Sequence, residues 1–150
     1  MSSNNLDVLY RQVIMDHYKN PRNKGILEDD SLTINMNNPT CGDRIQLTLK
    51  VENDQVVDAK FTGEGCSISM SSASMMTDAI KGRPIKEALK LAHIFSEMVQ
   101  GKDPEDLVED EDLDIGDIEA LSGVCKFPAR IKCATLAWKG MEKALHEEKE

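Results

Sequence analysis

The sequence predicts an α+β fold, in which a three-stranded antiparallel sheet is packed on one side by a layer of helices and preceded by an N-terminal helix. Two observations lead to this prediction. Three short runs between residues 32 and 61 alternate apolar and polar residues, as half-buried antiparallel strands do. The segments before and after these runs carry apolar residues at helical spacing. A small sheet with one solvated face needs a helical layer on its other face.

Length and composition fit a single domain over residues 1–150. A composition of 40% hydrophobic and 30% charged residues is globular rather than disordered. No apolar run approaches the ~20 residues that span a bilayer, and the N-terminus has no basic region followed by an apolar run. We therefore expect a cytoplasmic protein. A net charge of −9 disfavours nucleic acid and anionic membrane as partners.

The first helix is expected from about Asn5 to Lys19. Its apolar stripe consists of Leu6, Leu9, Val13 and Ile14. Asn20-Pro21 ends the helix, because the residue before a proline is displaced from helical backbone angles. His17 lies near the helix end and is interpreted as a surface residue, since histidines that bind metals usually have close companions.

Three strands are expected next. Their apolar positions are Leu32, Ile34 and Met36, then Ile45, Leu47, Leu49 and Val51, and finally Val56 or Val57, Ala59 and Phe61. Asn53-Asp54, between the second and third runs, suits a hairpin turn.

Three further helices supply the second layer. The segment from Cys66 to Lys81 mixes serines with methionines, and the methionines are interpreted as core filler. Pro84 begins the next helix, whose stripe is Ile85, Ala88, Leu89, Ala92, Phe95 and Val99, with His93 beside it. The last helix runs from about Phe127-Pro128 to Glu147. One of its faces carries Ile131, Thr135, Trp138, Met141 or Glu142, and Leu145.

Residues 103–119 form an acidic segment without a basic residue. A calcium loop is excluded, because Ile115 occupies the position of the required glycine and Leu121 that of the bidentate glutamate. We expect a solvated loop or an acidic docking surface. Leu113, Ile115, Ile118 and Leu121 indicate that part of the segment packs against the core.

Three cysteines stand where a thiolate is favoured, although none belongs to a C-x-x-C pair. Cys66 is expected to cap a helix N-terminus, whose dipole stabilises a thiolate. Cys133 follows Arg130 in the last helix, and Cys41 lies in a loop between strands. Outside a secretory context, cysteines favour metal or redox chemistry over disulfides. We therefore predict one metal site containing Cys41, Cys66 and Cys133, with Cys41 as its reactive member.

Asp43 is the expected fourth ligand, because no histidine is near the cysteines in sequence and residues two apart in a bent loop can both turn inward. Such a site is negatively charged and needs nearby cations, for which Arg130, Lys132, Lys126 and Arg44 are available, with Arg130 expected to balance the charge. Zinc is the default metal for a tetrahedral, thiolate-rich site, and an iron–sulfur cluster is also chemically possible. The alternative is that the cysteines are small buried apolar residues. We prefer this alternative for Cys125, which has no partner at metal-ligand spacing.

Four motifs together resemble the IscU-type, or NifU N-terminal-like, iron–sulfur cluster assembly proteins, specifically the SufU branch. They are Asp16–Asn23, Asn38–Asp43, Gly63–Ser69 and Lys126–Cys133. The resemblance runs over nearly the whole chain and implies the α+β fold described above. It also implies that Cys41, Asp43, Cys66 and Cys133 occupy the metal or cluster positions of the family.

Two features distinguish the chain within this family. The scaffold branch has a histidine directly before its last cysteine, where this chain has Lys132, and the acidic segment looks like the insertion that marks the SufU branch. The resemblance then implies a sulfur acceptor with one Zn²⁺ per chain. Its Cys41 would take persulfide sulfur from a pyridoxal-phosphate cysteine desulfurase of the SufS type and pass it to downstream cluster-assembly proteins. The alternative is a scaffold that assembles a transient [2Fe–2S] cluster on the same residues.

Overall fold

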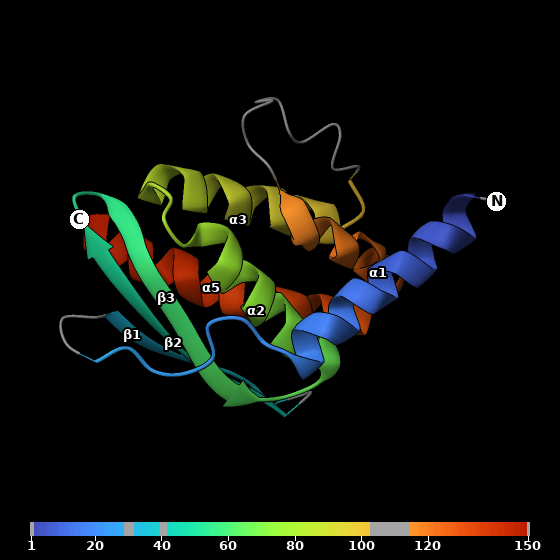
Figure 1. The fold of residues 1–150 in the computed structure, drawn as a ribbon, viewed down its shortest axis with the longest axis horizontal. Coiled ribbons are helices and arrows are strands. Elements are labelled where there is room, and N and C mark those ends of the chain that lie inside the picture. The colour runs from blue at the N-terminus through green and yellow to red at the C-terminus, as the bar shows by residue number, and fades with distance from the viewer. Residues whose placement is uncertain (1, 29–31, 40–41, 103–114, 150) are drawn as a thin grey trace.

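The computed structural model of the chain describes residues 2–28, 32–39, 42–102 and 115–149. Its elements are α1 (Ser2–Lys19), β1 (Leu32–Asn38), β2 (Asp43–Glu52), β3 (Gln55–Glu64), α2 (Ser67–Ile80), α3 (Ile85–Val99), the 3₁₀ helix η1 (Gly116–Lys126) and α5 (Pro128–Lys149) (Figure 1). The predicted α+β fold is confirmed, with strand and helix boundaries within a few residues of those expected. Within the described part of the chain, no helix is both long and apolar enough to cross a membrane.

The sheet has the strand order β1-β2-β3, and both pairings are antiparallel. Asn38 at the end of β1 pairs with Asp43 at the start of β2. The predicted hairpin between β2 and β3 is confirmed, because Asn53 and Asp54 both adopt positive φ, at 52° and 62°. These are the left-handed angles that a tight two-residue hairpin turn requires, and asparagine and aspartate tolerate them well.

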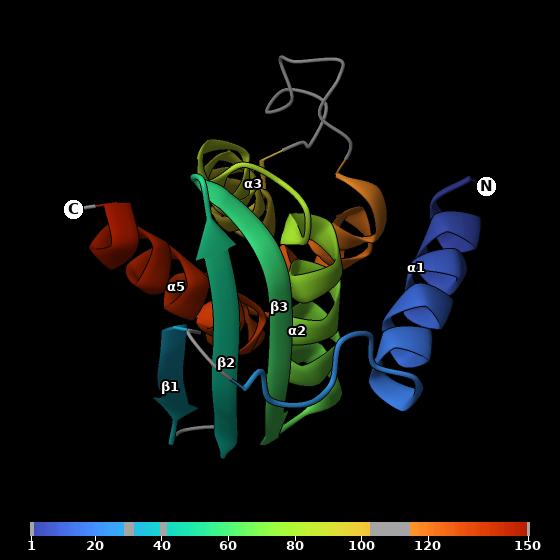
Figure 2. The same cartoon turned by 60° about the vertical axis from the view of Figure 1, so that its left-hand side comes forward.

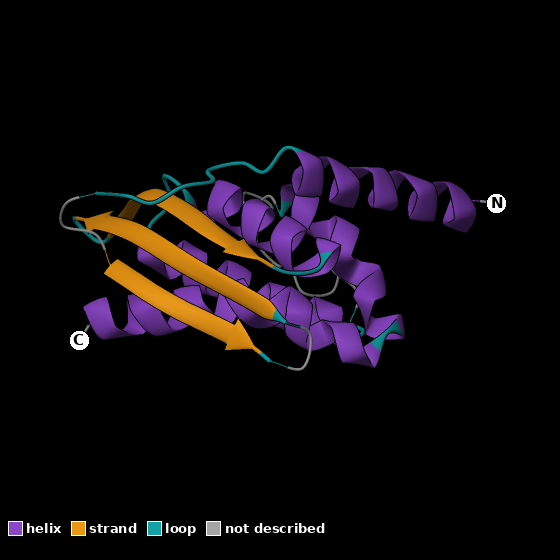
Figure 3. Cartoon of the chain, turned by 90° about the horizontal axis from the view of Figure 1, so that it is seen from below, coloured by secondary structure: helices purple, strands orange, loops and turns teal. Residues whose placement is uncertain are grey.

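The helices gather on one side of the sheet, as Figure 3 shows, and the core lies between the two layers. Ile45, Leu47 and Leu49 of β2 point into this core and are at most 2% exposed, as their alternation with polar residues predicts. Val56, rather than the 42% exposed Val57, continues the core in β3. The helical layer contributes large buried side chains, among them Trp138, Phe95, Leu91, Met75 and Met76. The rings of Phe95 and Trp138 stack with centroids 4.6 Å apart and thereby join α3 to α5.

The orientation of α1 differs from the predicted one. Leu9 is 51% exposed, whereas Tyr10, Val13 and Ile14 pack against the core. The reason is His17, which is only 1% exposed and is not a surface residue. Its Nδ1 lies 2.8 Å from Ser74 Oγ in α2, and its Nε2 lies 2.8 Å from an Asp117 carboxylate oxygen in η1. These two bonds fix the face that α1 turns inward.

The acidic segment is described only from residue 115 onward, so Leu113 and the acidic residues of 103–114 lie outside the described residues. Ile118 and Leu121 are buried in η1 and Ile115 is half-buried, which confirms that this end of the segment packs. His93 is exposed on α3, as expected from its place beside the apolar stripe.

One end of the sheet collects several chain segments that are far apart in sequence. The ends of β1 and β3, the start of β2 and the first turn of α2 meet here, because both pairings are antiparallel and α2 follows β3 directly. Figure 2 shows α5 crossing behind the strands on the helical side of the sheet. Among the described residues, the predicted metal ligands come from the start of β2, the N-terminus of α2 and the second turn of α5.

Candidate metal centre

Asp43 begins β2 with a side chain that is completely buried. Its Oδ1 accepts hydrogen bonds from the Cys66 backbone N–H at 3.0 Å and from the Ser69 hydroxyl at 2.9 Å. Its Oδ2 is also buried, yet it has no hydrogen-bond partner among the described residues. A buried polar atom without a partner costs about 1–3 kcal/mol, so this oxygen requires an explanation such as a bound cation.

Cys66 is the N-cap residue of α2, as the sequence predicts. It has extended backbone angles (φ −74°, ψ 168°), and its Sγ accepts a bond from the Ser69 backbone N–H at 3.5 Å. The free N–H groups and the dipole of a helix N-terminus stabilise negative charge, which suits a sulfur atom that binds a cation. The side chain is half-buried and the cysteine is not in a disulfide.

Cys133 lies in the second turn of α5 and is completely buried. The amide of Asn38 donates to its Sγ over 3.9 Å, a long contact from the end of β1. Arg130, one turn earlier and exposed, carries a guanidinium whose pKa is raised. The main cause of this raised pKa is a hydrogen bond to Cys133, followed by attraction to the charges of Cys66 and Cys133. Arg130 is therefore close enough to both sulfur atoms to be attracted by their charge.

The structure brings Asp43, Cys66 and Cys133 together. One ligand atom from each of these residues lies within 4.8 Å of the others, although the three come from β2, the start of α2 and α5. Cys41 lies outside the described residues. Asn38 and Asp43, which precede and follow it in the sequence, pair across β1 and β2. Asp43 belongs to this group of ligands, and Asn38 contacts Cys133.

The donor set fits a tetrahedral divalent cation. Two sulfur atoms and a carboxylate oxygen of Asp43 converge from three elements, and the guanidinium of Arg130 interacts with both cysteines. Thiolate-rich sets of this kind are typical of zinc, which prefers four N, S or O ligands. The Asp43 Oδ2 is the strongest sign, because an apolar interpretation of the cysteines leaves that buried oxygen without a partner among the described residues.

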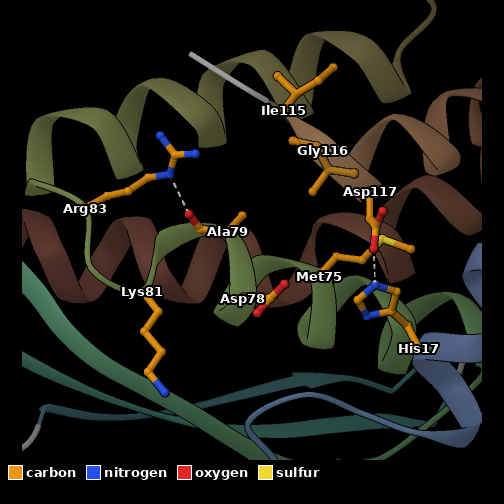
Figure 4. Close-up of a pocket in the computed structure, with 10 residues that line it drawn as sticks. His17, Met75, Asp78, Ala79, Lys81, Arg83, Ile115, Gly116 and Asp117 are labelled. Atoms are coloured by element: carbon orange, nitrogen blue, oxygen red, sulfur yellow. Dashed lines mark hydrogen bonds and ion pairs between the residues drawn. The ribbon is translucent and has the colours of Figure 1, made fainter. Parts of the chain in front are cut away.

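Histidine takes no part in this cluster. His17 is occupied by Ser74 and Asp117, and His93 and His146 are exposed. A cavity of about 470 Å³ next to His17 is lined by several charged residues, which include Asp78, Lys81, Arg83 and Asp117 (Figure 4). Asp43, Cys66 and Cys133 do not line this cavity.

Two residues that sequence reasoning did not single out touch the ligands directly. They are Ser69, which bonds to both Asp43 and Cys66, and Asn38, which contacts Cys133. A signal for Ser69 existed, because the third residue after an N-cap is the one whose backbone N–H the cap accepts. No local signal connects Asn38 with a cysteine 95 residues away.

Comparisons with known proteins point in the same direction. Residues 9–147 match the family model of the NifU-like N terminal domain. The chain is 67% identical over 144 residues to the "Zinc-dependent sulfurtransferase SufU" of Bacillus subtilis, covering 96% of this chain and 94% of that protein. It is 48% identical over 145 residues to the "Iron-sulfur cluster assembly scaffold protein IscU" of Streptococcus pyogenes, with 97% and 87% covered.

Solved structures have the same fold. A putative iron–sulfur cluster assembly scaffold protein for the SUF system from Fervidobacterium islandicum superimposes with a TM-score of 0.80 at 34% identity, over 89% of this chain and 94% of that one. The N-terminal part of a NifU-like protein from Brucella abortus also gives 0.80, and at 20% identity this likeness concerns the fold alone. Its family match, its full-length relatives and its fold agree: the chain belongs to the NifU-like N terminal domain family of iron–sulfur cluster assembly proteins.

Proposed function

We propose that this protein is a zinc-dependent sulfur acceptor, which takes persulfide sulfur from a pyridoxal-phosphate cysteine desulfurase and passes it on for iron–sulfur cluster building. The observation that carries the proposal is the cluster of an Asp43 carboxylate oxygen with the sulfur atoms of Cys66 and Cys133, beside a buried Asp43 Oδ2 that has no partner among the described residues. The Bacillus subtilis relative, whose name states zinc dependence and sulfur transfer, supports the proposal over almost the full chain.

The proposed ligands are Cys41, Asp43, Cys66 and Cys133, with one Zn²⁺ per chain. When bound, zinc holds its cysteine ligands as thiolates at neutral pH. Arg130 balances the negative charge of the two described sulfur ligands, as the rise in its pKa indicates. Covalent geometry keeps the Cα atoms of Cys41 and Asp43 within about 7 Å of each other, since only one residue separates them.

Cys41 is the proposed sulfur acceptor. Its thiolate attacks the outer sulfur of a persulfide on the desulfurase, so that a new S–S bond forms at Cys41. The bond between the outer and inner sulfur of the donor breaks at the same time, and the donor cysteine leaves as a thiolate. Cys41 then carries the persulfide to a downstream cluster-assembly protein. The buried Cys133 is closed to an incoming donor, which leaves the other cysteines of the site to react.

The proposal is tested by following the sulfur. The purified protein is analysed for zinc and iron per chain, then incubated with a cysteine desulfurase, pyridoxal phosphate and cysteine, and digested under non-reducing conditions. We expect about one zinc per chain and a peptide containing Cys41 that is heavier by one sulfur atom. A zinc-loaded protein that leaves all its cysteine peptides unmodified would contradict the proposed function.

A scaffold for a [2Fe–2S] cluster is the second candidate, because relatives at 48% and 36% identity are named as IscU scaffold proteins. Lys132, which stands where the scaffold branch has a histidine, is exposed and offers the site no such ligand. Anaerobic reconstitution with iron and sulfide distinguishes the two functions. A stable visible cluster spectrum with stoichiometric iron favours the scaffold, whereas retained zinc and a colourless protein favour the sulfur acceptor.

The desulfurase is proposed to dock beside the metal site. A groove of about 400 Å³ is lined by Tyr10, Ile14, Ile68, Val124 and Phe127, and Arg11 and Lys126 belong to the same groove. Ile68 follows Cys66 by two residues, and Phe127 precedes Arg130 by three, so the groove adjoins the site. Arg11 and Lys126 place two positive charges in this groove, although the chain as a whole has a net charge of −9. The groove therefore suits an apolar side chain flanked by acidic residues.

We expect Phe127→Ala to raise the protein concentration that gives half-maximal sulfur transfer by roughly tenfold, which is about 1.4 kcal/mol. Phe127 is 63% exposed, so truncation should leave folding and zinc content intact. The matched control is Val57→Ala, which removes an apolar side chain that is 42% exposed in β3, outside the groove. Equal effects of the two variants would argue against docking at this groove.

A further inference from the structure

Ser69 contacts two proposed ligands through two different groups. Its backbone N–H donates to Cys66 Sγ at 3.5 Å, and its hydroxyl donates to Asp43 Oδ1 at 2.9 Å. The residue lies in the first turn of α2 and is completely buried. A Ser69→Ala substitution keeps the backbone N–H and removes only the contacts of the hydroxyl, which are the bond to Asp43 Oδ1, the contact with the Cys66 carbonyl oxygen and a longer contact at 3.7 Å in which the Cys66 thiol donates to Oγ.

The hydroxyl bond determines which oxygen of Asp43 is satisfied within the protein. Oδ1 receives two donors, the Ser69 hydroxyl and the Cys66 backbone N–H, whereas Oδ2 receives none from the described residues. The Ser69 hydroxyl also lies 3.1 Å from the Cys66 carbonyl oxygen. A hydrogen bond to a carboxylate is stronger than one to a neutral carbonyl, so Asp43 is the preferred acceptor.

Gly65 supplies the space for this arrangement. A Cβ atom at position 65 would collide with Asp43 Oδ1 and would lie 2.5 Å from Ser69 Oγ. Unlike Gly63, at φ +150°, Gly65 does not adopt a left-handed backbone conformation. Its lack of a side chain is therefore needed for the contact between Asp43 and Ser69 and not for the path of the backbone.

We propose that Ser69 is a positioning residue of the metal site. Its hydroxyl, in the space left by Gly65, holds Asp43 in the orientation that occupies Oδ1 and leaves Oδ2 free for the metal. Without this hydroxyl, Asp43 keeps a single donor and can rotate, so it is no longer preorganised as a ligand. This inference rests on the proposed metal site and assigns the orientation of Asp43 within it to a residue that is not itself a ligand.

The primary test compares two serines of the same helix. Ser69→Ala is expected to weaken zinc binding roughly tenfold to 100-fold, as the loss of a hydrogen bond to a metal ligand usually does. Ser71→Ala is the matched control, because Ser71 is equally buried but its hydroxyl donates only to the Ile68 carbonyl oxygen. Zinc affinity is measured by competition with a chromogenic chelator, and the control should stay within about twofold of the unmodified protein.

The role of Asp43 as intermediary is tested by a double-mutant cycle. If Ser69 acts through Asp43, Ser69→Ala should cause no further loss of zinc affinity in an Asp43→Ala background. The visible spectrum of the Co²⁺-substituted protein should likewise change for Ser69→Ala but not for Ser71→Ala. The inference would be overturned if Ser69→Ala left zinc affinity unchanged. It would also be overturned if Ser69→Ala lowered zinc affinity equally in the unmodified protein and in the Asp43→Ala variant. Unchanged affinity in Asp43→Ala alone would instead overturn the proposed metal site.

A second pair of variants tests the space at Gly65. Gly65→Ala should weaken zinc binding at least as much as Ser69→Ala, because the added methyl group displaces Asp43 from Ser69. Gly123→Ala is its control, since a Cβ atom there meets nothing within 4 Å and the backbone is not left-handed. Zinc affinity that is the same in both glycine variants would contradict the assigned role of Gly65 and Ser69.

Discussion

A Cys41→Ser variant is expected to accept no sulfur from the desulfurase, although it folds like the unmodified protein. Serine keeps the size and polarity of the side chain but not the nucleophilic, polarisable sulfur on which persulfide exchange depends. The peptide containing residue 41 should therefore show no added sulfur atom after incubation with the desulfurase and cysteine. The same variant should lose zinc affinity, because one of four proposed ligands becomes a poor one.

Cys125→Ser is the control for this experiment. Cys125 is a half-buried free thiol outside the group formed by Asp43, Cys66 and Cys133, so its replacement should leave both zinc content and sulfur acceptance unchanged. Sulfur found on Cys66 or Cys125 in the Cys41→Ser variant at the full rate would show that another cysteine is the acceptor.

An Asp43→Asn variant is expected to change stability in opposite directions with and without metal. The amide oxygen of asparagine can keep both hydrogen bonds that Oδ1 now accepts, and the unpaired carboxylate oxygen is replaced by a neutral group. The metal-free variant should then be more stable than the unmodified protein by about 1 kcal/mol, since it no longer buries a carboxylate whose Oδ2 has no partner among the described residues. Urea denaturation in the presence of a chelator measures this difference.

Bound zinc is expected to reverse the order of stability of the unmodified protein and the Asp43→Asn variant. We expect Asp43→Asn to bind zinc about 100-fold more weakly, at the upper end of the effects seen for residues around metal ligands. At a free zinc concentration 100 times the dissociation constant of the unmodified protein, binding stabilises that protein by about 2.7 kcal/mol and the variant by less than about 1 kcal/mol. The unmodified protein should therefore become the more stable one.

Asp78→Asn provides the matched control, because it removes one negative charge from an exposed position of α2. Its effect on stability should stay within about 0.5 kcal/mol under both conditions, as for surface substitutions in general. An Asp43→Asn variant that is destabilised in both conditions would mean that Oδ2 has a partner within the protein and is not held ready for a metal.

Local sequence patterns were sufficient for most of the secondary structure. Alternation gave the three strands, Asn53-Asp54 marked the hairpin, and the position of Cys66 before a serine-rich helix indicated an N-cap. These features depend on backbone angles and side-chain spacing within a few residues, so they can be predicted without knowing what packs against them.

The face of α1 could not be predicted in the same way. The predicted apolar stripe contained Leu9 and not Tyr10, whereas in the structure Leu9 is exposed and Tyr10 packs against the core. Residues far away in the sequence fix the rotation of the helix, because Ser74 and Asp117 hydrogen-bond to the buried His17. A histidine with two such partners is indistinguishable in sequence from one on the surface.

The sequence by itself determined the proposed ligand chemistry, since the thiols, Asp43 and the nearby Arg130 were predicted from residue types and local position. Only the tertiary structure decided how they are arranged. Cys66 and Cys133 meet Asp43 because an antiparallel sheet and two helices deliver them to one end of the fold. The free oxygen of Asp43 is then selected by contacts with Ser69 and Cys66, in a space that exists because Gly65 has no Cβ atom.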